Sequence, residues 1–188
     1  MTVESFLEWA RARPEGERWE LVEGVPVPTR GPDPAHAMAP ETVRHARIKR
    51  RIDQALGDAI RGRGLRCEPF SSGPQVRIDA TSTFEPDVLV TCADVPEGLF
   101  VPEPVIVVEV LSKSTRERDF SAKLAGYASL TSVLHYLLVE TERRLIVHHH
   151  RLDGRHDFQT SIARGGSLSL DPPGLALDLD ALYAGLVA

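Results

Sequence analysis

The stretch that decides the fold runs from Pro102 to Thr115 and reads PEPVIVVEVLSKST. Its β-branched and aliphatic residues follow one another without polar alternation, which is typical of a central strand buried on both faces. Glu109 lies inside this run. An isolated ionised carboxylate in an apolar interior is costly unless a partner compensates its charge. Glu109 is therefore the first candidate for a functional residue.

The bulk properties indicate an ordinary globular chain. Its 188 residues suit one domain spanning residues 1–188, and 42% hydrophobic with 26% charged residues exclude a disordered protein. Two cysteines predict neither a disulfide framework nor a zinc motif. Glu4 and Glu8 stand where a signal peptide would be apolar, and no apolar run reaches the roughly 18 residues of a membrane span. We therefore expect a soluble, cytoplasmic protein with no membrane partner.

The pattern along the chain predicts an α/β (α+β) fold with a mixed sheet flanked by helices. A strand, a helix and a second strand between Val105 and Val139 predict a right-handed crossover and parallel pairing. A helix and hairpin are added at the N-terminus, and a hairpin turning at Asp153-Gly154 near the C-terminus. Helical patterns cover residues 2–13, 41–64 and 119–130 and a short terminal segment; strand patterns cover residues 18–28, 65–80, 84–92, 105–111, 133–140 and 143–163.

Two carboxylates and one lysine lie where packing alone would not put them. Asp87 opens a strand after Pro86, and it converges with Glu109 if the two strands are neighbours. Two carboxylates at close range repel, so one takes a proton or a cation lies between them. Carboxylate oxygens with no nearby histidine or thiolate favour Mg²⁺ or Mn²⁺ over zinc. Such an ion keeps waters, one of which can become a nucleophile.

Lys123 would reach the same end of the sheet if its helix packs with that face inward, where an ammonium can stabilise charge on a phosphate. Plainer alternatives exist for two of these residues. Asp119 and Lys123, one helical turn apart, could form a surface ion pair worth a few tenths of a kcal/mol. Asp87 could be a turn or strand-start residue. Glu109 differs from them, because apolar residues flank it on both sides and leave it hard to solvate; its plain alternative is a salt bridge to a core arginine far from Asp87.

These residues belong to a longer pattern. The segments EPDVLVT (85–91) and PVIVVEVLSKSTRERDFSAKLAGYASLTSVLHYLLVE (104–140) resemble the Uma-type restriction-endonuclease family, a branch of the PD-(D/E)XK phosphodiesterase superfamily. WELVEG (19–24) is similar to the opening hairpin of that family, and PPGLALDLDALY (172–183) to its usual ending. The ordered set spans nearly the whole chain, although no single element is specific.

The resemblance implies a restriction-endonuclease-like core in which Asp87 and Glu109 bind a metal ion. It also implies that the backbone carbonyl of Val110 completes the metal shell. The superfamily lysine normally lies two residues after the second carboxylate, where this chain has Leu111, so Lys123 resembles a migrated substitute. Lys113 stands where the family usually has proline. Members of the superfamily are often dimers, so the resemblance allows a homodimer that no residue pattern shows.

Further candidates have weaker support. Glu20 is either an additional acidic group near the metal or a solvent-facing strand residue. His45 stands where the family usually has a histidine, and it either contacts a phosphate or water or caps the helix start. Tyr127 and Asp119 share a helix face with Lys123 and would orient it. The basic residues Arg44, Arg47 and Arg51 on the first long helix would follow a phosphodiester backbone, unless they form only a solvated face.

The three consecutive histidines from His148 to His150 invite a metal interpretation, but only His148 and His150 point to the same face. A strand at a solvent edge explains them better. The favoured hypothesis is a Mg²⁺-dependent nuclease that hydrolyses phosphodiester bonds in DNA. The alternative is a nuclease fold kept as a nucleic-acid-binding or interaction module with weak or no catalysis. The formal charge of −5 and the displaced lysine favour the alternative.

Overall fold

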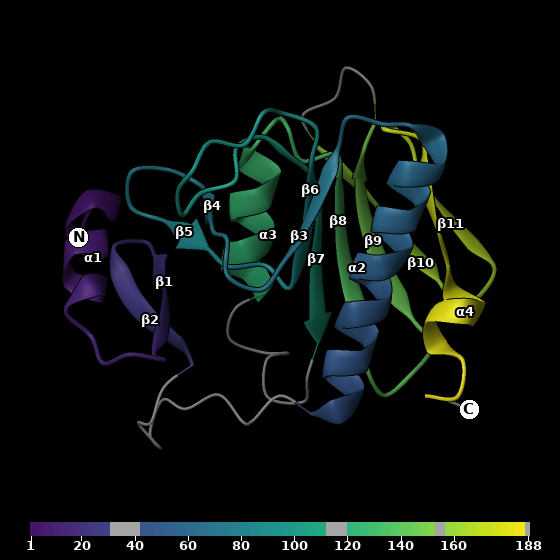
Figure 1. Ribbon diagram of the computed structural model, residues 1–188, viewed down its shortest axis with the longest axis horizontal. Coiled ribbons are helices and arrows are strands. Elements are labelled where there is room, and N and C mark those ends of the chain that lie inside the picture. Colours follow the sequence, from purple (N-terminus) through teal and green to yellow (C-terminus); the bar gives the residue numbers. More distant parts are fainter. Residues whose placement is uncertain (31–41, 112–119, 153–156, 187–188) are drawn as a thin grey trace.

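A six-stranded mixed sheet forms the centre of the computed structural model, which describes residues 1–30, 42–111, 120–152 and 157–186 (Figure 1). Strands β7 and β8 pair in parallel, and the other neighbours in this sheet pair antiparallel. The predicted mixed sheet with a parallel central pair is therefore confirmed. Its strands, in spatial order, are β10 (Phe158–Ala163), β9 (Ile146–Arg151), β8 (His135–Glu140), β7 (Pro104–Leu111), β6 (Val88–Thr91) and β3 (Glu68–Ser71).

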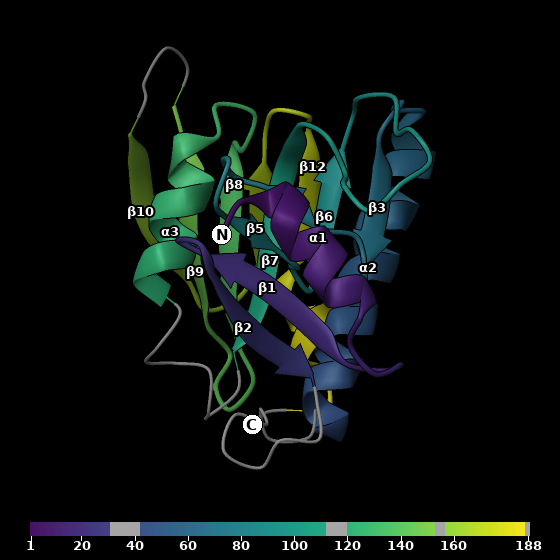
Figure 2. The ribbon, with the colours of Figure 1, turned by 90° about the vertical axis from the view of Figure 1, so that its left-hand side faces the viewer.

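Two helices cover opposite faces of this sheet, and Figure 2 shows them on either side of the strands. Helix α2 (Val43–Arg63) packs on one face, and α3 (Phe120–Ser129) lies between β7 and β8 in the chain and covers the other. Each face has its own apolar core, which is why the β7 sequence shows no polar alternation.

Helix α2 has the boundaries and the apolar stripe that its sequence predicts. The Thr42 side chain accepts a hydrogen bond from the His45 amide at 3.2 Å, which caps the first turn. Gly64 ends the helix with a φ of 63°, a left-handed conformation that glycine adopts without strain. The buried residues between these ends lie four apart and face the sheet: Ile48, Ile52, Leu56 and Ile60.

A smaller sheet carries the N-terminal hairpin. Its spatial order is β2 (Val25–Arg30), β1 (Arg18–Val22), β5 (Thr83–Phe84) and β4 (Val76–Arg77), and helix α1 (Val3–Arg11) packs beside β1. Gly24 makes the hairpin turn with a φ of 80°. The N-terminal helix and hairpin are therefore confirmed, although the hairpin joins a second sheet instead of the central one.

The C-terminal part adds a hairpin that the sequence patterns did not indicate. Strands β11 (Ser167–Leu170) and β12 (Leu175–Asp178) pair antiparallel, and the short helix α4 (Leu179–Tyr183) follows. The predicted hairpin of β9 and β10 is present, but its turn at Asp153-Gly154 lies outside the described residues. None of the helices in the described ranges is both long and apolar enough to cross a membrane.

Two predictions are wrong. Cys67 and Cys92 form a disulfide, because Cys67 directly precedes β3, Cys92 directly follows β6, and the antiparallel pairing of Glu68 with Thr91 places them opposite one another. The interpretation of the histidine run as a solvent-edge strand also fails. Strand β9 lies inside the sheet between β8 and β10, and His148 and His149 are buried.

Candidate active site

Glu109 lies near the carboxyl end of β7 and points to the α3 face of the sheet. Its neighbours Val108 and Val110 pack in the α2-side core, so the strand alternation directs the glutamate to the opposite side. There its Oε1 lies 3.0 Å from the Nζ atom of Lys123 and accepts a hydrogen bond of 3.3 Å from the Tyr127 hydroxyl. The carboxylate that the sequence left without compensation therefore has a lysine and a tyrosine as partners.

Lys123 joins two carboxylates. Its Nζ atom lies 3.0 Å from Glu109 Oε1 and also 3.0 Å from Oε1 of Glu20, which is the central residue of β1. The Glu20 side chain is 1% exposed, and its Oε1 accepts a hydrogen bond of 2.7 Å from the Glu85 amide. The alternative of a solvent-facing Glu20 is therefore wrong, because β1 turns this side chain towards α3.

Asp87 lies at the start of β6, directly beside the Glu109–Val110 segment. Val88 pairs with Val108, so the antiparallel register places Asp87 opposite Glu109. Its Oδ2 accepts a hydrogen bond of 2.7 Å from the Val110 amide. The predicted convergence of the two carboxylates at one end of the sheet is confirmed. The metal-ligand role of the Val110 carbonyl stays a prediction.

Helix α2 supplies two cationic or polar groups to Asp87. The His45 Nε2 atom lies 3.3 Å from Asp87 Oδ1, and the Lys49 Nζ atom lies 3.7 Å from the same oxygen. His45 therefore does more than cap its helix, whose first turn Thr42 already caps. Sequence reasoning missed Lys49. The signal was its position four residues after His45, which puts both side chains on one helix face.

The charges of the site follow from burial and from these partners. Burial raises the pKa of Glu109 to about 8; Lys123 opposes this shift, while the negative charges of Asp87 and Glu20 add to it. For Asp87, burial alone would raise the pKa. The hydrogen bond and charge of His45, the Val110 amide and Lys49 outweigh burial and lower it. The pKa values of the two carboxyl groups therefore shift in opposite directions, so that Asp87 is held ionised and Glu109 is ready to take a proton.

Burial also raises the pKa of the Tyr127 hydroxyl well above its usual value, and the charge of Glu109 contributes. Tyr127 is therefore a neutral hydrogen-bond donor at neutral pH. Its ring packs edge-on against Phe84, with 5.5 Å between the ring centroids. The tyrosine thus fixes the Glu109 side chain without adding charge.

The arginines that were predicted to bind nucleic acid differ in their contacts. Arg51 donates hydrogen bonds of 2.8 and 2.9 Å to the carbonyls of Leu182 and Ala184, so it anchors the C-terminal segment to α2. Arg44 lies 3.2 Å from a carboxylate oxygen of Glu142, and Arg47 is exposed. Their contact with a phosphodiester backbone stays a prediction. Asp119 lies outside the described residues, as does Lys113.

The donor chemistry of the site fits a magnesium or manganese ion. In the described part of the chain, no three or more His, Cys, Asp or Glu side chains are arranged to hold a metal by themselves. Mg²⁺ commonly binds through one or two carboxylates and completes its shell with waters and substrate phosphates. Asp87 and Glu109 supply that pair, with Glu20 close by. The sequence pattern showed no histidine near these carboxylates, but the structure places the His45 ring nitrogen 3.3 Å from Asp87.

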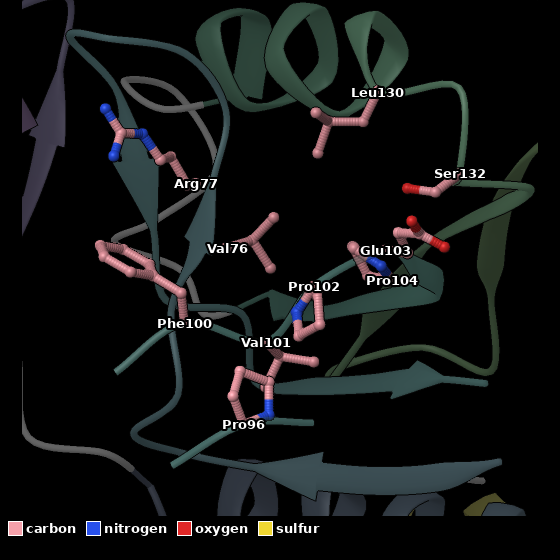
Figure 3. A pocket seen from close by; sticks show the side chains of 10 residues that line it. All are labelled: Val76, Arg77, Pro96, Phe100, Val101, Pro102, Glu103, Pro104, Leu130 and Ser132. Carbon is pink, nitrogen blue, oxygen red and sulfur yellow. The ribbon is translucent and has the colours of Figure 1, made fainter. Parts of the chain in front are cut away.

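A separate pocket opens at the other end of β7 (Figure 3). It has a volume of about 370 Å³, and its lining includes Val76, Arg77, Phe100, Glu103 and Leu130. It begins at Pro104, which lies about 17 Å along the strand from Glu109 at about 3.3 Å per residue. This pocket is therefore distinct from the carboxylate site.

Comparison with known proteins places the chain in a family. Residues 3–181 match the Uma2 family, described as "putative restriction endonuclease". The chain belongs to this family, which confirms the resemblance seen in the sequence.

Two further proteins are similar to this chain over nearly its whole length. An uncharacterized protein of Synechocystis sp., slr1290, is 28% identical over 189 residues, which cover 99% of this chain and 93% of that protein. A crystal structure described as "a putative nuclease belonging to DUF820", from Anabaena variabilis, superposes with a TM-score of 0.72. It is 13% identical and covers 99% of both chains, so it confirms the fold class.

Proposed function

We propose that this protein is a metal-dependent nuclease that hydrolyses phosphodiester bonds in DNA. The observation that carries the proposal is the meeting of Asp87, Glu109 and Lys123 at one end of the central sheet. The Val110 amide holds Asp87 at 2.7 Å, and Lys123 lies 3.0 Å from Glu109. Two carboxylates and a lysine converging from three different elements are an arrangement for which packing offers no reason. Membership of the Uma2 family supports the same activity.

The protein side chains would divide the work between charge and position. Asp87 and Glu109 would hold Mg²⁺ or Mn²⁺, with the Val110 carbonyl beside them. The ion would supply Lewis-acid stabilisation of the negative charge that develops on the phosphate. Lys123 would leave its ion pair with Glu109 to donate to a phosphate oxygen or to orient the attacking water. Tyr127 would hold the Glu109 carboxylate in place through its hydroxyl.

A second function has one observation in its favour. Lys123 bridges Glu20 and Glu109 so closely that its ammonium already neutralises part of the acidic charge. A nuclease fold kept as a nucleic-acid-binding module could use this bridge as a purely structural contact. Such a module would have no need of a metal ion between Asp87 and Glu109.

Cleavage assays on purified protein test the proposal. Wild-type protein should cut plasmid and linear DNA when Mg²⁺ or Mn²⁺ is present and should stop when a chelator is added. Glu109→Gln keeps the shape of the side chain and removes its charge, so cleavage should fall by about 100-fold or more. Glu103→Gln is the matched control, because Glu103 lies just before the other end of β7 and is exposed. This control should cut DNA as the wild type does.

Calorimetric titration with Mn²⁺ separates the two functions. A nuclease should show a saturable ion site that is lost in Asp87→Asn. Equal cleavage by wild type and Glu109→Gln would refute the mechanism. DNA binding without cleavage and without a saturable ion site would establish the binding module instead.

A further inference from the structure

Strand β10 is an edge of the central sheet that lacks the usual protection of edge strands. An edge strand presents unpaired backbone N–H and C=O groups to any other strand, and proteins usually protect it with proline or charge. β2 carries Pro26 and Pro28, and β3 carries Pro69 and a glutamate. β10 reads FQTSIA and contains neither a proline nor a charged residue.

The side chains of β10 are also exposed. The four central residues of the strand, from Gln159 to Ile162, are exposed on both faces of the sheet. Ile162 is 56% exposed, although its β-branched side chain is well suited to packing against a neighbouring strand. Phe158, on the same face as Ile162, is only half-buried, and Arg151 stacks on its ring at 4.8 Å.

Symmetry restricts how this strand can pair with a copy of itself. A two-fold axis through an antiparallel strand pair places one residue directly opposite the same residue of the other copy. When that residue is Thr160, Phe158 lies opposite Ile162 of the second copy, and Gln159 lies opposite Ser161. Aromatic residues opposite β-branched residues, and threonine opposite threonine, are among the favourable cross-strand pairs. The sequence of β10 is therefore complementary to itself in this register.

We propose that two copies of this chain associate through β10, antiparallel and centred on Thr160, to form one continuous sheet. The neutral strand brings no like charges together, and each copy of Phe158 covers the exposed Ile162 of the other. Strands β9 and β8 separate β10 from β7, so the interface leaves the carboxylate site open. The proposal is thus independent of the nuclease activity.

The mass of the protein in solution tests this interface. Wild-type protein should sediment as a dimer, with dissociation on dilution. Ile162→Lys places a charge opposite Phe158 of the second copy and should yield monomers at concentrations where the wild type is dimeric. Val25→Lys is the matched control, since Val25 is 60% exposed on the proline-containing edge β2. It should leave the dimer intact, and circular dichroism should show that both variants are folded.

Cysteine cross-linking tests the register. Residues opposite one another on antiparallel strands have Cα atoms about 4.5–5.5 Å apart, within the range of a disulfide. Thr160→Cys should therefore cross-link two copies under oxidation. Gln159→Cys alone should not, because a diagonal pair is about 7–8 Å apart, yet it should cross-link when mixed with Ser161→Cys.

Three results would overturn the proposal. The first is a wild type that stays monomeric at every concentration, and the second is a dimer that survives Ile162→Lys. The third is a dimer that Thr160→Cys fails to cross-link, which includes pairing of β10 with a different strand or a different protein.

Discussion

Two buried polar clusters occupy opposite faces of the central sheet, and they differ in how they compensate the desolvation of their polar groups. The acidic cluster (Glu20, Asp87, Glu109 and Lys123) lies mainly on the α3 face, although Asp87 also contacts α2, and it places a lysine between carboxylates. The histidine cluster (His135, His148 and His150) lies on the α2 face, where β8 and β9 pair His135 with His150 and Leu137 with His148. Its rings lie about 5 Å apart between centroids.

Two members of the histidine cluster, His135 and His148, are neutral at neutral pH, because burial lowers the pKa of both rings. His135 Nε2 lies 2.8 Å from the Pro172 carbonyl, which can only accept, so this nitrogen carries the hydrogen. The other ring nitrogen, Nδ1, then accepts from His148 Nε2 at 2.9 Å. Burial, followed by the neighbouring histidines, lowers the pKa of His148 to about 3. A chain of neutral hydrogen bonds thus joins β8 and β9 to the loop before β12.

The difference shows which buried polar group is a functional candidate. Burial disfavours the charged form of every group, and His135 and His148 remain neutral as a result. In the acidic cluster, one lysine is placed between two carboxylates and a third carboxylate is held by a backbone amide. Asp87 stays ionised there in spite of its desolvation cost, whereas Glu109 is ready to take a proton, and such divergent pKa values are expected where a reaction requires them.

Of the substitutions considered, removal of Lys123 should lower the free energy of unfolding most. Lys123→Met leaves Glu20 and Glu109 buried together without their shared cation, and breaking a buried ion pair costs about 3–5 kcal/mol. The free energy of unfolding, measured by urea denaturation, should fall by about this amount. The double variant Lys123→Met, Glu109→Gln should recover most of the loss. An unchanged stability in the single variant would show that the lysine does not compensate these carboxylates.

The two clusters should also make stability depend on pH with opposite signs. The pKa of Glu109 is raised from 4.5 to about 8 by folding, so the folded protein binds more protons than the unfolded chain between these values. The contribution of Glu109 to the free energy of unfolding should therefore decrease as the pH rises from 4.5 to 8. Glu109→Gln, measured in the presence of a chelator, should remove this decrease. An identical slope in wild type and variant would contradict the raised pKa.

His148 provides the contrasting arm of the same experiment. Its pKa falls from 6.5 to about 3 on folding, so the unfolded chain binds more protons, and stability is lost as the pH drops below 6.5. At pH 5 this contribution should amount to about 2 kcal/mol, at 1.36 kcal/mol per pKa unit. His148→Gln should remove the loss of stability below pH 6.5. It should leave the decrease in stability between pH 6.5 and 8, which Glu109 causes, unchanged. A variant that changes stability both below pH 6.5 and between pH 6.5 and 8 would show that the two clusters are coupled.

The sequence allowed prediction of the acidic cluster because its signals are local. A glutamate inside an apolar run, an aspartate at a strand start and a lysine in the following helix suffice once two strands are assumed to be neighbours. Lys49 and the burial of Glu20 depend on how α2 and the small sheet pack, which no local pattern records. The histidine cluster needed the pairing of β8 with β9. Without that pairing, the run from His148 to His150 resembled a solvent edge.

Helix α3, which carries Lys123 and Tyr127, approaches β5 closely at Gly126. A substitution at this glycine should displace the acidic cluster without changing the histidine cluster. A Cβ atom on Gly126 would lie 2.6 Å from a ring carbon of Phe84, closer than packed atoms allow. Gly126→Ala should therefore push α3 away from β5 and lower the free energy of unfolding by about 1–3 kcal/mol. Gly62→Ala is the matched control in α2, where nothing lies within 4 Å, and it should stabilise by up to about 1 kcal/mol.

Helix α3 carries Lys123 but no histidine. Its displacement should therefore change how stability depends on pH between 6.5 and 8, and it should leave the His148 contribution below pH 6.5 intact. Urea denaturation of both variants across the pH range measures this. A Gly126→Ala protein as stable as the Gly62→Ala control would contradict the close approach of α3 to Phe84. If Gly126→Ala instead removed the pH dependence of stability below pH 6.5, α3 would also support the histidine cluster. The two faces of the sheet would then not be independent.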